Sequence, residues 1–196
     1  MATFWGMDLA VSKVAIARLP LPETGVLYVK APKVPLEQHE ERIAKACWLA
    51  GCVDEALKDA GPSDILAIES SSASGRSHAV SVGEVFGLVL RVVISHLAGR
   101  WMLVNPIHLK MFPTNDHRAT GAKMAAAAQR LWGFEGQQNG DAYEDELDAF
   151  CLAQIARCVA EPEEFTAYQR EIVQRCFITT GKKPVRKNLQ CEVRAE

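Results

Sequence analysis

The sequence predicts an α/β fold in which a mixed five-stranded sheet is flanked by helices. Three short strand-like segments with short links open the chain, which is typical of an antiparallel meander. Two later strand-like segments each follow a helical pattern, as strands joined by helical crossovers do. Further helical patterns come after the last strand. The predicted strands are residues 3–10, 14–18, 25–31, 64–69 and 101–105, and the predicted helices are residues 36–60, 80–97, 123–132, 141–160 and 163–177.

The first predicted helix, residues 36–60, has apolar residues at helical spacing. The residues that share this stripe are Ile43, Ala46, Cys47, Ala50, Val53 and Leu57. Gly61-Pro62 ends the helix. The polar residues 70–77 and residues 107–120 are predicted loops, and residues 137–140 are a predicted turn.

The second predicted helix, residues 80–97, is the most apolar and reaches the length of a membrane span. Glu84 and Arg91 lie near its middle, where each charge would cost a few kcal/mol in a bilayer, so we expect a central helix outside the membrane. Gly83 and Gly87 lie one turn apart and would let another helix approach closely. That helix could belong to the same chain or to a second copy.

The composition is that of a globular protein rather than of a basic nucleic-acid-binding tail. The chain has 196 residues, 48% of them hydrophobic and 23% charged, and a net charge of -2. We expect one domain over residues 1–178 and a polar, flexible tail over residues 179–196. The first residues do not have the pattern of a secretory signal, so none is expected, and the six cysteines have no zinc-site spacing. A cytoplasmic protein with buried, reduced cysteines is therefore expected.

Asp8 is the single charge in the first predicted strand. The side-chain period of a strand puts Phe4, Gly6 and Asp8 on one face. A sheet with helices on both sides buries both faces, and an ionised group there is costly unless it is paired or bound to a metal. Asp8 is therefore a candidate functional residue.

Three further carboxylates stand at positions where burial would be costly. Glu69 closes an apolar strand, at the end where ligands of open α/β sheets collect. In the helix 141–160, a turn of 100° per residue places Asp148 on the apolar stripe, with Asp145 beside it. The positive end of the helix dipole stabilises acidic residues in a first helical turn by a small free energy. That free energy does not explain a carboxylate on the buried stripe.

A site whose ligands are all carboxylate oxygens suits Mg²⁺ or Mn²⁺. Several carboxylates around two such cations are used for phosphodiester hydrolysis, where one cation activates water and the other stabilises the leaving oxygen. The sequence thus predicts a nuclease-type metal site at Asp8, Glu69, Asp145 and Asp148.

These residues resemble the RuvC family of Holliday-junction resolvases, within the RNase H-like, or retroviral integrase, superfamily. The similar features are the strand-borne Asp8, Glu69 in Ala-Ile-Glu-Ser, and Asp145-Glu-Leu-Asp148-Ala at the start of a helix. The segment with Asn105-Pro106, Lys110 and Thr120-Gly121-Ala-Lys123 is similar to the basic stretch of that family. The resemblance covers about residues 3–160.

The resemblance implies an RNase H-like fold, with two Mg²⁺ ions per site for which Mn²⁺ can substitute. It implies that Asp8 bridges both ions, that Glu69 holds one, and that Asp145 and Asp148 hold the other. The chain departs from the family in two places: Leu9-Ala10 stand where Pro-Gly is common, and the loop 70–77 has no aromatic residue.

Local charge agrees with a nucleic-acid partner. Residues 71–130 contain seven Lys or Arg against two Asp or Glu, a balance of +5. Arg76, Lys110, Arg118 and Lys123 fall in predicted loops or at a helix start, where they could contact DNA phosphates. His108 and His117 lack metal-site spacing and are expected at the surface.

The sequence-based hypothesis is a Mg²⁺-dependent, structure-selective endonuclease that nicks branched DNA such as four-way junctions. A homodimer is expected, because a two-fold dimer supplies two equivalent sites for two matched nicks, with the helix 80–97 at its interface. The small size is compatible with a phage-encoded member acting in the host cytoplasm. The alternatives are an RNase H-type or rRNA-processing nuclease of the same superfamily, and a non-catalytic junction-binding protein.

Overall fold

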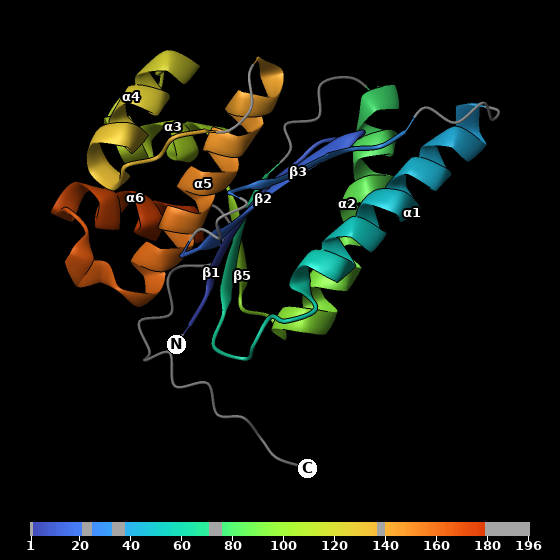
Figure 1. Cartoon of the computed structure of the whole chain (residues 1–196), viewed down its shortest axis with the longest axis horizontal. Coiled ribbons are helices and arrows are strands. Elements are labelled where there is room, and N and C mark those ends of the chain that lie inside the picture. Colours follow the sequence, from blue (N-terminus) through green and yellow to red (C-terminus); the bar gives the residue numbers. More distant parts are fainter. Residues whose placement is uncertain (1, 21–24, 33–37, 71–75, 137–139, 179–196) are drawn as a thin grey trace, which may run out of the picture.

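One mixed sheet of five strands, in the order β3-β2-β1-β4-β5, forms the centre of the molecule (Figure 1). The structure, a computed structural model, describes residues 2–20, 25–32, 38–70, 76–136 and 140–178. The strands are β1 Phe4–Leu9, β2 Lys13–Leu19, β3 Leu27–Lys30, β4 Ile65–Glu69 and β5 Trp101–Val104. β1, β2 and β3 pair antiparallel, whereas β4 is parallel to β1 and β5 is parallel to β4. The predicted mixed sheet is confirmed.

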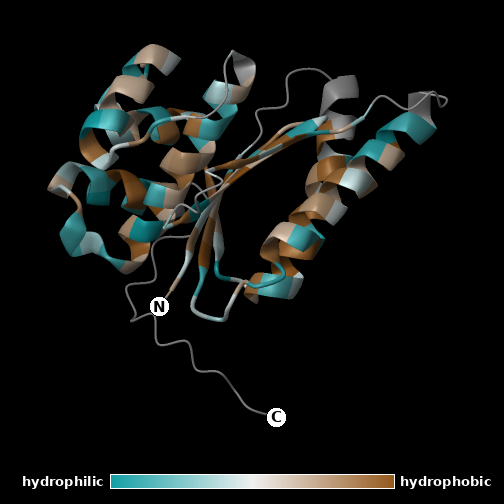
Figure 2. Ribbon diagram, viewed as in Figure 1, coloured by the Kyte–Doolittle hydropathy of each residue, from teal (hydrophilic) through white to brown (hydrophobic). Residues whose placement is uncertain are grey.

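Helices cover both faces of the sheet (Figure 1). α1 Gln38–Leu57 and α2 Arg76–Leu97 lie on one face. The other face carries α5 Asp141–Ala160, with α3 Pro106–Thr114, α4 Gly121–Trp132, a short 3₁₀ helix Pro162–Glu164 and α6 Ala167–Ile178 around it. Figure 2 shows hydrophobic residues concentrated along the strands and α2. No helix in the described part of the chain is both long and apolar enough to span a bilayer.

The sheet separates two hydrophobic cores. Alternate residues of β1 belong to different cores: Trp5 and Met7 pack with α1 and α2, and Phe4 packs with α5. β2 alternates in the same way, so that Ala15 and Ala17 face α5. The side of β1 that carries Asp8 is thus the side that α5 covers.

Gly6 lets α5 lie directly on β1. A Cβ atom added to Gly6 would lie 2.0 Å from the carbonyl oxygen of Ala149 and 2.3 Å from the amide nitrogen of Ala153. Only a residue without a side chain permits this approach of two backbones. The first turns of α5 are thereby held close to the end of β1.

Asp64 fixes β1 against β4 at the opposite end of the sheet. Its buried carboxylate accepts hydrogen bonds from the backbone nitrogen of Thr3 (2.8 Å), from that of Gly61 (3.1 Å) and from Trp5 Nε1 (3.1 Å). The resulting register pairs Met7 with Ile68.

The prediction of a loop over residues 107–120 is wrong, because its first part is the helix α3. The Asn105 side chain caps this helix by accepting a hydrogen bond from Ile107 N (2.8 Å), and Pro106 occupies the first turn. Proline is favoured at the first helical position, so Asn105-Pro106 marks the start of this helix. Asn115, with φ of 58°, ends the helix.

Two other predicted helices differ in detail. The segment 163–177 contains the 3₁₀ helix and then α6, which begins only at Ala167. Thr166 and Gln169 form a capping box there, each side chain accepting from the other's backbone nitrogen. In α1, Ile43 and Cys47 are exposed although they were predicted on the buried stripe.

Several predicted features lie wholly or partly outside the described residues. They are the loop 70–77 over residues 71–75, the turn 137–140 over residues 137–139, and the tail 179–196 with Cys191. Arg76 and Ser77 belong to α2 rather than to the predicted loop. Of the cysteines in the described chain, Cys151, Cys158 and Cys176 are buried, Cys52 is partly buried and Cys47 is exposed.

Candidate metal centre

The site lies at the carboxyl ends of two neighbouring parallel strands. Because Met7 pairs with Ile68, the next residues along β1 and β4, Asp8 and Glu69, are also neighbours. Both side chains are partly buried. An ionised carboxylate is costly to bury, so two of them side by side either take up protons or need a compensating charge.

α5 adds further carboxylates above these strands. Asp148 lies on the side of α5 that faces the sheet, as predicted. One carboxylate oxygen from each of Asp8, Glu69 and Asp148 lies within 4.8 Å of the others. We call these three residues the acidic cluster. They come from three elements, so the cluster depends on the close packing of α5 on β1.

Burial and mutual repulsion raise the pKa of every carboxyl group in the acidic cluster. Desolvation raises the pKa of Asp8 to about 7, with further contributions from Asp145. Desolvation, followed by the charges of Asp8 and Asp148, raises the pKa of Glu69 to about 8. Desolvation and the charge of Asp8 raise the pKa of Asp148 to about 7. A bound cation would reverse this effect, because opposite charge favours the ionised form.

The donor set of the acidic cluster fits Mg²⁺ or Mn²⁺. It consists of oxygen atoms only, which hard divalent cations prefer, and it contains no histidine or thiol that would favour a softer metal. The three carboxylates can therefore act as ligands of a divalent cation.

Asp145, the fourth predicted ligand, lies beside the acidic cluster and is paired with a lysine. Its Oδ2 is 2.5 Å from Nζ of Lys13, at the start of β2. Asp145 also lies close enough to Asp8 to help raise the pKa of Asp8. Lys13 was not a predicted site residue. The strand period does place Lys13 on the same face of β2 as Ala15 and Ala17. Its position near Asp8 could be predicted only with the register between β1 and β2, which the sequence does not give.

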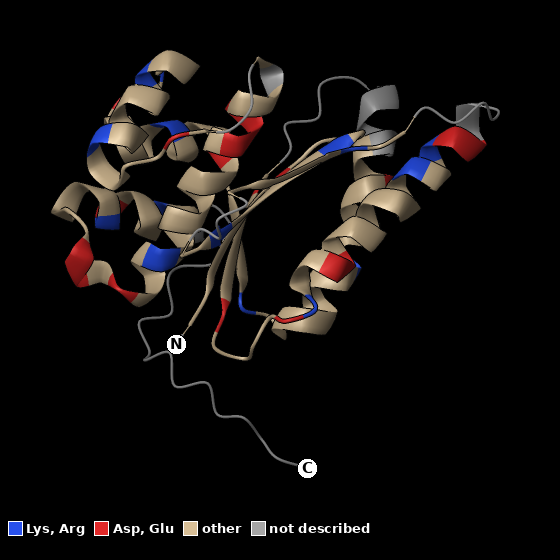
Figure 3. Cartoon of the chain, viewed as in Figure 1, with Lys and Arg blue, Asp and Glu red and all other residues tan. Residues whose placement is uncertain are grey.

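The predicted DNA-binding residues lie mainly on α3, α4 and the loop between them (Figure 3). Lys110 lies in α3, not in a loop, and its positive charge lowers the pKa of both Glu69 and Asp148. Arg118 and Lys123 are exposed, and Lys123 pairs with Asp116 at 3.2 Å. The side chain of Arg76 lies outside the described part of the structure.

The two predicted surface histidines differ. His117 is exposed, and its Nε2 accepts a hydrogen bond from Nε of Arg118 at 3.2 Å. His108 is partly buried, 3.7 Å from Sγ of Cys176, and desolvation lowers its pKa.

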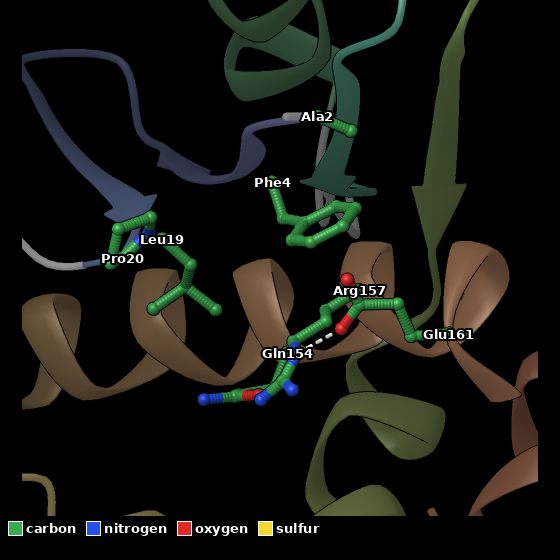
Figure 4. A pocket seen from close by; sticks show the side chains of 7 residues that line it. All are labelled: Ala2, Phe4, Leu19, Pro20, Gln154, Arg157 and Glu161. Atoms are coloured by element: carbon green, nitrogen blue, oxygen red, sulfur yellow. Dashed lines mark hydrogen bonds and ion pairs between the residues drawn. The ribbon is translucent and has the colours of Figure 1, made fainter. Parts of the chain in front are cut away.

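A cavity of about 520 Å³ lies away from the acidic cluster, between the start of β1, the end of β2 and the second half of α5 (Figure 4). Its lining residues are Ala2, Phe4, Leu19, Pro20, Gln154, Arg157 and Glu161. Arg157 and Glu161 pair with each other at 2.6 Å. The acidic cluster is not among these residues, so the cavity and the candidate metal ligands are separate features of the molecule.

Comparison with solved structures shows which fold this is. The chain superposes on Thermus thermophilus RuvC with a TM-score of 0.56 and 17% sequence identity, covering 80% of this chain and 94% of that one. A structure described as T. thermophilus RuvC in complex with Holliday junction substrate gives a TM-score of 0.57 and 16% identity, with 81% and 95% covered. No protein-family model and no curated protein sequence matches the chain. The fold is RuvC-like and RNase H-like, as the sequence resemblance implied.

Proposed function

We propose that this protein is a metal-dependent, structure-selective endonuclease that nicks branched DNA such as four-way junctions. The observation that carries the proposal is the acidic cluster, in which three carboxylates from β1, β4 and α5 bring their oxygens within 4.8 Å of one another. Oxygen clusters of this kind hold the cations used in phosphodiester hydrolysis.

In this proposal Asp8, Glu69 and Asp148 hold the cation. A bound Mg²⁺ or Mn²⁺ supplies activation of water and stabilisation of the leaving oxygen. Asp8, on the central strand, contributes from the middle of the site, with Glu69 on one side and Asp145 on the other. Because the pKa values of the cluster are raised, its carboxyl groups are partly protonated until a cation binds.

Positively charged side chains near the acidic cluster support a nucleic-acid substrate. Lys110 is close enough to affect the ionisation of Glu69 and Asp148, so it is placed to hold a phosphate beside the cation. Arg118 and Lys123 extend this charge along the loop and the start of α4, where they would contact neighbouring phosphates. Arg76 would add a contact from the start of α2.

The substrate is proposed as a four-way junction because a protein of similar fold was solved with a Holliday junction. Such a substrate has two equivalent strands to cut, so we also propose that the chain acts as a two-fold dimer. α2 supports this part of the proposal. Relative to the buried Val85, a turn of 100° per residue places Gly83, Gly87 and Ile94 on the opposite side of the helix.

This outer face of α2 is exposed and carries Gly83, Gly87 and Ile94 together with the polar residues Arg91 and Ser95. Ile94 is 52% exposed, and a Cβ added to Gly83 or Gly87 would meet no described atom within 4 Å. Within the described part of the chain, neither glycine is therefore needed for a close contact with another helix. They leave room for a second copy of α2.

The function is tested by incubating the protein with Mg²⁺ and three substrates: a four-way DNA junction, a linear duplex of the same sequence and an RNA–DNA hybrid. We expect cleavage of the junction and little of the others. Asp8→Asn and Asp148→Asn should each lower the cleavage rate by about a thousand-fold, the equivalent of several kcal/mol of lost transition-state stabilisation. Junction binding, measured in EDTA by gel shift, should be retained.

Asp59→Asn is the matched control, because the same substitution is made at an exposed carboxylate in the turn after α1. It should cleave like the wild type. Preferential cleavage of the hybrid would contradict the proposal of a junction substrate and would favour an RNA-containing substrate. Junction binding without cleavage by any variant, unaffected by EDTA, would identify a non-catalytic binding protein.

A further inference from the structure

Lys13 places a positive charge inside the carboxylate site. Its Nζ is 2.5 Å from Oδ2 of Asp145, and the two side chains are only 28% and 13% exposed. Lysine carries a positive charge at neutral pH, so an ammonium group lies against Asp145, beside the cluster.

The hairpin between β1 and β2 determines this position. Asp8 opposes Ala15 across the two strands, and Lys13 lies two residues before Ala15, on the same face. Lys13 is thus the diagonal neighbour of Asp8 under α5. Its backbone is fixed by the turn, where Ala10 N donates to the Lys13 carbonyl oxygen at 3.0 Å.

The two sides of Asp8 consequently differ. On the β4 side lies the acidic cluster, where Glu69 and Asp148 complete a set of oxygens within 4.8 Å. On the β2 side Asp8 lies beside Asp145, whose Oδ2 is 2.5 Å from Nζ of Lys13. On this second side, the positive charge of Lys13 already compensates the charge of a carboxylate.

A divalent cation at Asp145 would have to displace the ammonium of Lys13 from a largely buried carboxylate. Two positive charges at that range repel strongly in a partly dry site. Within the described part of the structure no such ion pair occupies the acidic cluster, because Lys110, the other lysine that affects it, is exposed.

We propose that Lys13 takes the place of one of the two cations that a site of this kind would hold. The chain then binds one divalent cation, at Asp8, Glu69 and Asp148, while Lys13 positions Asp145 and, through it, Asp8. The inference rests on the proposed function only in taking these carboxylates as a metal site.

The test is the number of ions bound by the full-length protein in the absence of DNA. Mn²⁺ is titrated by calorimetry into protein freed of metal with EDTA. The wild type should bind one ion per chain, and Lys13→Met, which keeps the apolar stem and removes the charge, should bind two. Lys13→Met combined with Asp145→Asn should return to one. Electron paramagnetic resonance should show coupled Mn²⁺ pairs in Lys13→Met alone.

Lys13→Arg is the matched control, because it keeps the charge and should keep a stoichiometry of one. Two ions per wild-type chain, or one ion per folded Lys13→Met chain, would overturn the proposal. If Lys13→Met does not fold, the wild-type number still decides. Failure of the proposed function is distinguishable: one ion bound without junction cleavage contradicts only the function, and no ion bound contradicts both.

Discussion

At the scale of single residues, the acidic cluster opposes folding in the absence of a cation. The carboxyl groups of Asp8, Glu69 and Asp148 have pKa values of about 7 to 8 in the folded chain, against 3.8 to 4.5 ordinarily. Between about pH 4 and pH 8 the folded chain binds more protons than the unfolded chain, so its stability falls as the pH rises through this window. We expect urea denaturation in EDTA to show this decline, and Asp148→Asn to make it shallower.

At pH 8 in EDTA, Asp148→Asn should therefore be more stable than the wild type, although it loses activity. Saturating Mg²⁺ should stabilise the wild type and have less effect on Asp148→Asn, because ligand binding to the folded chain adds to its free energy of unfolding. Asp59→Asn serves again as the control and should follow the wild type throughout. A wild-type stability that stays level or rises from pH 5 to pH 8 would contradict the expectation.

The residue-level predictions depended on charges in apolar surroundings. Asp8, Glu69 and Asp148 were recognisable because a carboxylate in a buried strand or stripe is costly, and the structure brings them together. Lys13 was not recognisable in this way. It stands next to a turn, where lysine is ordinary, and its role appears only when the hairpin register and α5 bring it to Asp145.

At the scale of elements, the site depends on how closely α5 approaches β1. Gly6→Ala would place a methyl carbon 2.0 Å from the Ala149 carbonyl oxygen, in the backbone of α5. The helix would have to move, and with it Asp145 and Asp148. We expect a loss of about 3 kcal/mol or more of stability, as for severe overpacking, together with weaker binding of Mn²⁺ in the calorimetric titration.

Gly51→Ala provides the comparison for Gly6→Ala. Gly51 lies within α1, and a Cβ there would meet no described atom within 4 Å. Alanine in a helix interior should stabilise the chain by about 0.5–1 kcal/mol and leave Mn²⁺ binding unchanged. Equal effects of the two substitutions on stability would show that α5 does not depend on Gly6 for its approach.

The elements themselves were predictable where periodicity was strong. The five strands and the long helices α1, α2 and α5 follow from alternating or helical apolar patterns. The short α3 was missed, because its boundaries depend on the Asn105 cap and on Pro106 rather than on a long apolar stripe. The start of α6 was displaced for a similar reason, since the capping box of Thr166 and Gln169 decides it.

At the scale of the whole molecule, the two helical layers serve different purposes. The layer of α3 to α6 carries Asp145, Asp148, Lys110, Arg118 and Lys123, whereas α1 and α2 bury one side of the sheet and contribute no residue to the acidic cluster. The proposed dimer contact on α2 would therefore leave the acidic cluster uncovered. The order of strands and layers was predictable, but the outward direction of Gly83 and Gly87 was not.

The proposed dimer gives the final prediction. Analytical ultracentrifugation of the wild type at micromolar concentration should give the mass of two chains. Ile94→Arg should give that of one, because it replaces the large exposed apolar side chain of this face with a second positive charge near Arg91. Leu131→Arg is the matched control, since Leu131 is a 39% exposed apolar residue on α4, in the other layer. It should leave the dimer intact. A monomeric wild type, or equal behaviour of the two variants, would assign the α2 face no role in association. Since one junction needs two cuts, Ile94→Arg should also uncouple the two nicks, so that singly nicked junctions accumulate.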